Sequence, residues 1–191
     1  DQSANANDAT QTSTGAQPKI YDGTTGVVTE NGKPAAQFDG AGDELHATSY
    51  DETTLTSVLI SVNDTTSNLD RASIISGNTG SSKNTMGHAS DFTLRYDGAF
   101  SQGSQTPATG TQYLRFAVRS TSQQTEFVNS ASNINTSLTL PNASGTINLG
   151  SAANSSLHYQ GKIQEAILYS SDQSSNRTNI EDNINTFYSI Y

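Results

Sequence analysis

The 191-residue chain contains no cysteine, so neither a disulfide framework nor a thiolate metal site can form. Basic residues are also scarce: nine lysines and arginines stand against eighteen acidic residues, and the net charge is −9. Non-specific nucleic-acid binding needs a basic surface that displaces counterions from phosphates, so we expect no nucleic-acid partner. No apolar run approaches the roughly 20 residues of a membrane-spanning helix, so we expect no membrane insertion.

Motifs of several enzyme classes are missing as well. The glycine-containing stretch at 76–90 lacks the Gly-Lys-Ser/Thr ending of a phosphate-binding loop, and no Gly-x-Ser-x-Gly elbow of a serine hydrolase occurs. The three histidines, His46, His88 and His158, lie far apart and show no His-x-x-x-His spacing. We therefore expect no cofactor and no metal-dependent hydrolysis.

The composition that remains is polar but sparsely charged. Hydrophobic residues make up only 32% of the chain and charged residues 14%, while Ser, Thr and Asn together supply more than a third. So polar a chain cannot bury both faces of every element. Two antiparallel sheets packed on one thin core, with hydroxyl-rich outer faces, fit this composition best. The length is sufficient for one large all-β domain.

Apolar and polar side chains alternate along most of the chain, which indicates β-strands. In the segment 55–63, the residues that share one face are Val58, Ile60 and Val62. Asn31-Gly32 interrupts another alternating stretch and supplies the positive φ angles of a tight hairpin. These local patterns predict a sandwich of short antiparallel strands joined by turns.

The end of the chain departs from this alternation. Apolar residues recur there at helical spacing, namely Ile180, Ile184, Phe187, Tyr188 and Tyr191. The spacing predicts a C-terminal helix at about 175–190, with Ser174 or Ser175 as its N-cap, lying against the sandwich through this stripe.

Two segments carry a resemblance to a known family. The sequence FDGAGDELHA at 38–47, together with the C-terminal segment 159–191, resembles the concanavalin A-like, laminin-G-like jelly roll. Phe-Asp-Gly with a second Asp matches an early strand and turn of that family. Gly161 and Glu165 match its late Gly-x-Ile-x-Glu strand, and the helix matches its usual terminal helix. The resemblance implies an antiparallel two-sheet jelly-roll sandwich with a short C-terminal α-helix.

The first residues carry a second resemblance. The opening DQSANANDATQ is similar to a stretch of large multi-domain bacteriophage virion proteins and secreted bacterial proteins, although Ala4 and Ala6 stand where glycines are usual. A related stretch occurs in arabinofuranosidase-type sandwiches. Because the chain begins at Asp1 without a signal-peptide pattern, we expect residues 1–191 to be one domain of a longer chain.

Glu165 decides whether the domain is interpreted as an enzyme. A glycosidase needs two carboxyl groups, about 5–5.5 Å apart for retention or about 6.5–9.5 Å apart for inversion. Strict alternation puts Gly161, Ile163, Ile167 and Tyr169 on the face of Glu165, and none is acidic. We therefore expect Glu165 to be a structural carboxylate, paired with backbone N–H groups or an arginine, and the domain to be non-catalytic.

Asp39 and Asp43 are candidate ligands of a calcium ion, because hard cations take carboxylate and carbonyl oxygens and laminin-G-like domains often bind calcium. The alternative is an Asp-Gly turn in which the carboxylate accepts hydrogen bonds from its own backbone. The spacing matches no calcium loop with a defined ligand order, which favours the turn.

Polar residues of two segments are candidates for ligand binding. In YLRFAVRS, Tyr113, Arg115 and Arg119 alternate with apolar residues, and Arg95 lies opposite Phe92 in a second segment. If the two strands are neighbours, one face joins an aromatic ring to guanidinium groups, which bind carboxylates or sulfates bidentately. We predict an acidic or hydroxylated glycan as the ligand. The alternative is a solvated strand face whose charges pair with nearby acids.

For function, the favoured interpretation is a non-catalytic module on a virion or a secreted protein, such as a tail-fibre or head-decoration domain. Its expected partners are glycans, a host surface or neighbouring subunits, a homo-oligomer included, and its expected location is the virion surface or the extracellular space. The alternatives are a polysaccharide-active glycoside hydrolase domain of the same fold and a structural spacer or oligomerisation domain. The fold alone does not separate them, because this sandwich supports many functions.

Overall fold

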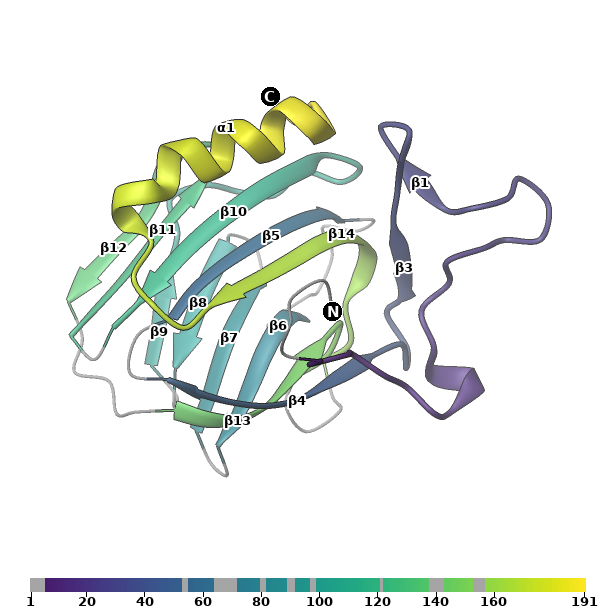
Figure 1. The fold of residues 1–191 in the computed structure, drawn as a ribbon, viewed down its shortest axis with the longest axis horizontal. Helices are drawn as coiled ribbons and strands as arrows, with labels where there is room; N and C mark the ends of the chain where they lie inside the picture. The colour runs from purple at the N-terminus through teal and green to yellow at the C-terminus, as the bar shows by residue number, and fades with distance from the viewer. Residues whose placement is uncertain are drawn as a thin grey trace.

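The computed structural model describes residues 6–52, 55–63, 72–79, 82–88, 92–96, 99–120, 122–137, 143–152 and 157–191. Two six-stranded antiparallel sheets pack face to face, and a helix lies across one of them (Figure 1). Sheet A consists, in spatial order, of β4 (Leu45–Glu52), β13 (Ala143–Leu149), β6 (Ala72–Thr79), β7 (Ser82–His88), β8 (Phe92–Tyr96) and β9 (Ala99–Gln102). Sheet B consists of β12 (Ala131–Ser137), β11 (Gln123–Val128), β10 (Gln112–Arg119), β5 (Leu55–Asn63), β14 (Gln160–Tyr169) and β3 (Ala36–Asp39). The predicted antiparallel two-sheet sandwich is thus confirmed.

The smaller elements complete the architecture. They are β1 (Thr29–Glu30), β2 (Lys33–Pro34), α1 (Arg177–Tyr188) and the short 3-10 helices η1 (Thr14–Ala16) and η2 (Ser174–Asn176). β1 and β2 pair around Asn31 and Gly32, whose φ angles of 47° and 70° confirm the predicted tight turn. The terminal helix is also confirmed, but Asn176 is its N-cap and forms no side-chain capping bond, so the predicted serine cap is wrong.

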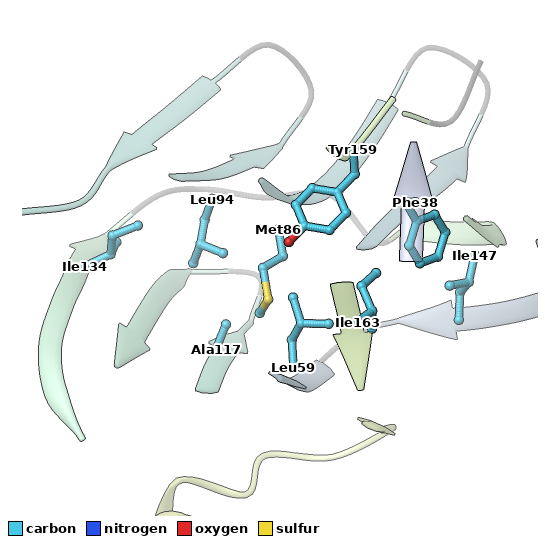
Figure 2. Packing of buried hydrophobic residues seen from close by; sticks show 9 residues of the cluster. All are labelled: Phe38, Leu59, Met86, Leu94, Ala117, Ile134, Ile147, Tyr159 and Ile163. Carbon is cyan, nitrogen blue, oxygen red and sulfur yellow. The ribbon is translucent and has the colours of Figure 1, made fainter. Parts of the chain in front are cut away.

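The inter-sheet core is one apolar layer between sheets A and B (Figure 2). Met86 and Leu94 of sheet A point toward Leu59 and Ala117 of sheet B, and all four are buried. At one end of this layer, Tyr159 lies against Phe38 and donates a hydrogen bond of 2.7 Å from its hydroxyl to the carbonyl of Val62. This hydrogen bond satisfies the one polar atom that the ring brings into the core.

A second apolar layer lies on the other side of sheet B, beneath α1. Its buried members are Val58, Ile60, Leu114, Phe116, Val118, Ile184 and Tyr188. β10 therefore packs against sheet A with one set of alternate side chains and against the helix with the other. All eight of its residues are buried.

An irregularity in β14 changes which side chains face the core. The pairing with β5 shifts between Ile163 and Glu165. Ile163 consequently belongs to the inter-sheet core, whereas Ile167 packs in the layer beneath α1. A β-bulge places one extra residue in a strand and so reverses the alternation beyond it.

The N-terminal segment runs along the edges of both sheets. Thr10 pairs with His46 at the edge of β4, and Lys19 pairs with Gln37 at the edge of β3. Residues 19–28 then form a hairpin, closed by the Tyr21–Val27 bridge, that projects beside β3 (Figure 1). No helix within the described ranges is both long and apolar enough to cross a membrane.

Candidate functional site

The structure places the predicted ligand-binding residues of β10 in the interior. Tyr113 is 9% exposed, and Arg115 is completely buried, as Arg119 nearly is. They share one face of β10 as predicted, but that face points toward sheet A, because α1 covers the apolar face that we had assigned to the core. The prediction of an exposed Tyr–Arg face is therefore wrong, and ligand binding by these three residues lacks the exposure that it assumed.

Arg115 belongs to a polar network within the core. Its Nε donates a hydrogen bond of 2.8 Å to Oε1 of Glu126, and Nη1 donates one of 2.9 Å to the carbonyl of Gly87. Asn133 donates a hydrogen bond of 2.6 Å to the other Glu126 oxygen, and the Phe92 ring centroid lies 4.8 Å from the guanidinium carbon. A buried charge is tolerated when it is paired in this way. This cluster is structural in character.

Arg95, the fourth predicted residue, lies in the other sheet. β8 pairs with β7 and β9, and β10 pairs with β5 and β11, so the two strands are not neighbours. Strand pairing is a long-range property that local alternation does not reveal. Arg95 instead pairs with Thr85 of β7 and Phe100 of β9.

The strand register extends this pairing into a transverse row across sheet A. The row, hereafter the outer row, consists of His46 in β4, Asn148 in β13, Ser76 in β6, Thr85 in β7, Arg95 in β8 and Phe100 in β9. Neighbouring strands lie about 4.8 Å apart, so six strands span roughly 24 Å. A ligand of several linked units can lie along such a row.

The outer row lies on the face of sheet A that is turned away from sheet B. Met86 and Leu94, which adjoin Thr85 and Arg95 in sequence, are buried in the inter-sheet core. Ser101, which follows Phe100, donates a hydrogen bond of 2.9 Å to Gln124 in sheet B. Successive residues of a strand occupy opposite faces, so the outer row occupies the face away from α1 and sheet B.

Rows on either side of the outer row are also polar. Asn78 pairs with Thr146 and with Lys83 on one side, and Thr93 pairs with Gln102 on the other. Thr146 and Gln102 are exposed, so both margins of this face reach solvent. By residue type, the outer row holds hydroxyl, amide and guanidinium residues and one phenylalanine at paired backbone positions.

Hydrogen bonds fix one end of the outer row. His46 Nδ1 lies 3.0 Å from Oδ1 of Asn148, and its Nε2 lies 3.2 Å from the carboxylate of Glu44. Ser151 donates a hydrogen bond of 2.6 Å to the other Glu44 oxygen, and Asn148 donates one of 3.2 Å to the carbonyl of Ala152. At this end Asn148 is buried and His46 lies in the edge strand β4, and the opposite end of the row lies in the other edge strand, β9.

Asp39 and Asp43 form a turn. One oxygen of Asp39 accepts the backbone N–H groups of Ala41, Gly42 and Asp43 at 2.8, 3.1 and 3.3 Å, and Asp43 accepts the N–H of Asp39 at 3.0 Å. Burial raises the pKa of Asp39, but the three N–H donors outweigh it and hold that pKa below its usual value. Burial, followed by the charge of Asp39, raises the pKa of Asp43.

This geometry is the Asp-Gly turn, in which the carboxylate accepts hydrogen bonds from its own backbone, that Sequence analysis gave as the alternative to a calcium site. Among the residues that the structure describes, no group of three or more histidine or acidic side chains is arranged to hold a metal ion. Two of the four carboxylate oxygens are engaged by backbone donors. Calcium binding by Asp39 and Asp43 stays a prediction.

Glu165 lies beneath α1, outside the inter-sheet core. The bulge in β14 turns it toward the helix, where the hydroxyl of Tyr188 is its hydrogen-bond partner. Burial, the charge of Glu165 and this hydrogen bond raise the pKa of Tyr188 to about 12. The partner differs from the expected backbone N–H or arginine, and Gly161 and Ile163 do not share its face.

Sequence reasoning did not find the outer row. Five of its residues come from strands without a single acidic residue, in a chain with twice as many acids as bases, namely Asn148, Ser76, Thr85, Arg95 and Phe100. That local absence of carboxylates was a detectable signal. The order of the strands was not, because only the fold brings β4 and β9 to opposite edges of one sheet.

Comparison with known proteins supports the fold. No protein-family model and no curated protein matches the sequence. One similar solved structure is domain 4 of AbnA, an extracellular GH43 arabinanase from Geobacillus stearothermophilus, in complex with arabinotriose. It is 14% identical to this chain, and the match has a TM-score of 0.63 and covers 78% of this chain and 76% of that one. The heptameric SAP-like pentraxin of Limulus polyphemus is 13% identical, with a TM-score of 0.60 over 78% and 82%.

The binding domain of botulinum neurotoxin serotype G is also similar, at 12% identity and a TM-score of 0.62 over 90% of this chain and 48% of that one. Identities this low show the fold alone. The chain therefore has an antiparallel two-sheet jelly-roll sandwich with a short C-terminal helix, as the sequence predicted.

Proposed function

We propose that the chain is a non-catalytic glycan-binding module and that the outer row of sheet A forms its binding face. The observation that carries the proposal is the register, which places Arg95 and Phe100 beside Thr85 and Ser76 on one face. An aromatic residue suits the apolar face of a sugar ring, and hydroxyl and guanidinium groups suit its hydroxyls. The arabinotriose bound to domain 4 of AbnA supports a saccharide as the ligand.

The placement of Glu165 supports a non-catalytic role. Hydrolysis by this fold needs a carboxyl group that reaches the scissile bond. Glu165 is engaged by Tyr188 beneath α1, on the opposite side of the sandwich from the outer row. Strands β6 to β9, which carry most of the row, contain no acidic residue at all.

The expected setting is the surface of a secreted protein or a virion. The opening sequence resembles virion and secreted proteins, and AbnA is an extracellular enzyme. In either setting, the module would attach a larger protein to a glycan-bearing surface. The alternative is that the module binds neighbouring protein subunits of the same particle.

The test combines a glycan array with calorimetric titration of the purified chain. We expect Phe100→Ala to weaken binding roughly fivefold to tenfold, as an aromatic contact worth about 1 kcal/mol or slightly more would. The matched control is Tyr21→Ala, because Tyr21 is 62% exposed on the hairpin beside β3, away from sheet A. Binding of no glycan on the array, or equal losses in both variants, would show that the proposal is wrong.

A further inference from the structure

Large apolar side chains that remain exposed gather at one end of the molecule. The described part of the chain exposes six of them, and five lie in two segments. The hairpin at 19–28 carries three, and the residues at and just beyond the end of α1 carry two. The five, hereafter the end surface, are Ile20, Tyr21, Val27, Phe187 and Tyr191. In a chain that is only 32% hydrophobic, this concentration indicates an interaction surface.

The β1–β2 hairpin joins the two segments into one region. Val28, which directly precedes β1, donates a hydrogen bond of 3.0 Å to the carbonyl of Ile20, and its own carbonyl accepts one of 2.9 Å from Ala35. Lys33 of β2 places its Nζ 3.8 Å from the centroid of the Phe187 ring. In Figure 1, β1 accordingly lies between the end of α1 and the projecting hairpin. Both groups of exposed residues therefore belong to the same end of the molecule.

The shape of the projecting hairpin is fixed by its own hydrogen bonds. One oxygen of Asp22 accepts the backbone N–H groups of residues 24–26 at 2.7, 2.6 and 3.2 Å. The N–H of Asp22 donates a hydrogen bond of 3.0 Å to the carbonyl of Gly26. The cross-strand pair of Tyr21 and Val27 lies directly next to this turn. Because the hairpin is already ordered, a partner that binds it avoids the entropic cost of ordering a flexible loop.

The exposed area matches one side of a protein–protein interface. The five residues of the end surface are 50–66% exposed. At roughly 200 Å² per large side chain, this leaves about 500 Å² of mainly apolar surface in contact with solvent. A standard interface buries about 800 Å² on each partner, of which roughly 60% is apolar. The end surface therefore supplies the apolar area that one side of such an interface requires.

Charge favours a second copy of the chain as the partner. The chain carries −9 overall, so two copies repel one another where acidic residues dominate. Residues 17–37, however, contain Lys19 and Lys33 against Asp22 and Glu30, and residues 183–191 contain no charged side chain. The end surface thus belongs to segments whose side-chain charges sum to zero. Two copies can meet there without bringing an excess of negative charge together.

We infer that the end surface binds a second copy of the chain in a two-fold dimer. In a two-fold interface both copies use the same surface, and each contact occurs twice. Ile20 and Tyr21 occupy opposite faces of the hairpin, so burying both requires a partner that encloses it. Each hairpin lies against the helix end of the other copy, so that Val27 contacts the partner's Phe187.

The inference is independent of glycan binding, because no residue of the outer row belongs to the end surface. Loss of the dimer should therefore leave the calorimetric affinity of each glycan-binding face unchanged.

Sedimentation equilibrium of the purified chain, between about 1 and 100 μM, tests the inference. Wild type is expected to dimerise with a Kd in the micromolar range or below, as interfaces of this size do. Val27→Asp places an unpaired carboxylate in the interface twice per dimer and should weaken dimerisation at least about 100-fold. Leu157→Asp is the matched control, because Leu157 is an exposed apolar residue outside the end surface, and its φ of 56° is one that Asp adopts readily. It should dimerise like wild type.

A mixture of two variants tests the reciprocal contact. Phe187→Lys alone should also be monomeric, because it places an unpaired ammonium group opposite Val27. In an equimolar mixture of Val27→Asp and Phe187→Lys, one contact becomes an Asp–Lys pair and the other stays apolar, so the dimer should form again. Circular dichroism should show each variant folded, because all the substituted positions are exposed.

A wild-type chain that is monomeric at about 100 μM would overturn the inference and leave the end surface to a different partner. A dimer that survives Val27→Asp, or an equal loss in Leu157→Asp, would place the interface elsewhere and overturn it too. The same holds for a mixture that stays monomeric and for open chains of copies, since neither is compatible with a reciprocal two-fold contact.

Discussion

Replacing Glu126 by glutamine tests whether the buried ion pair supports the packing of the two sheets. Both partners are completely buried, and Oε1 of Glu126 accepts the 2.8 Å hydrogen bond from Nε of Arg115. Glutamine is almost the same shape, so the substitution removes the negative charge with little change in volume. Arg115 then keeps its charge in the core, with the carbonyl of Gly87 and the ring of Phe92 as its described partners.

The expected cost follows from this uncompensated charge. Removing one member of a buried pair typically destabilises a protein by about 3–5 kcal/mol. For a chain of this size, each kcal/mol lowers Tm by about 2–4 °C, so the expected decrease is roughly 6–20 °C. The double variant Arg115→Met/Glu126→Leu removes both charges and should lose less than Glu126→Gln alone, although Gly87 and Asn133 lose a hydrogen-bond partner.

The assay is calorimetry and urea unfolding of the two variants beside Glu30→Gln. Glu30 pairs with Lys162 at 2.9 Å, but both side chains are more than a fifth exposed, so its loss should cost less than about 1 kcal/mol. A Tm for Glu126→Gln within about 2 °C of wild type would contradict the reasoning. So would a double variant that is less stable than the single one.

Three predictions concern pH. The pKa of Tyr188 is raised to about 12, so its contribution to stability is complete below pH 10.0 and is lost as pH rises through about 12. Tyr188→Phe should remove this loss, and it should also remove one tyrosinate absorbance step at high pH from the titration of the folded protein. Burial raises the pKa of Glu181, so Glu181→Gln should flatten the decline of the unfolding free energy as pH rises above 4.5. Hydrogen bonds from Thr25 and neighbouring N–H groups lower the pKa of Asp22 to about 2. As pH falls from 3.8 toward 2, the protection of the turn amides against exchange, relative to their intrinsic rates, should therefore fall, and Asp22→Asn should lose this pH dependence. If the pH profile of any of these variants were the same as that of the wild type, the physical cause assigned to that residue would be wrong.

Local patterns in the sequence were sufficient for the elements and the fold class. The Asn31-Gly32 turn and the terminal helix are encoded within a few residues, and the structure shows both. Alternation predicted strands at β5 and β10 correctly, because a period of two reports extended backbone wherever one face is buried.

Alternation could not show which face of a strand meets the other sheet. In β10 the apolar set Leu114, Phe116 and Val118 packs under α1, so the arginine-bearing set forms the interior. The sequence offers no local sign of this, because either set becomes internal according to where a helix distant along the chain docks. The bulge before Glu165 had the same effect, since one extra residue reverses every later position.

The position of α1 also explains why the candidate site lies on sheet A. The helix covers the outer side of sheet B, so that sheet needs apolar residues on both faces of its central strands, and β5 and β10 provide them. Sheet A has no such helix among the described residues, and Met86, Leu94 and Ile147 are its buried contribution to the core between the sheets. Acidic residues would serve solubility equally well on the outer face of sheet A, yet strands β6 to β9 contain none while the chain as a whole is strongly acidic. Solubility alone does not require that selective absence, which is a further reason to place the proposed ligand on sheet A and not on the helix-covered side of sheet B.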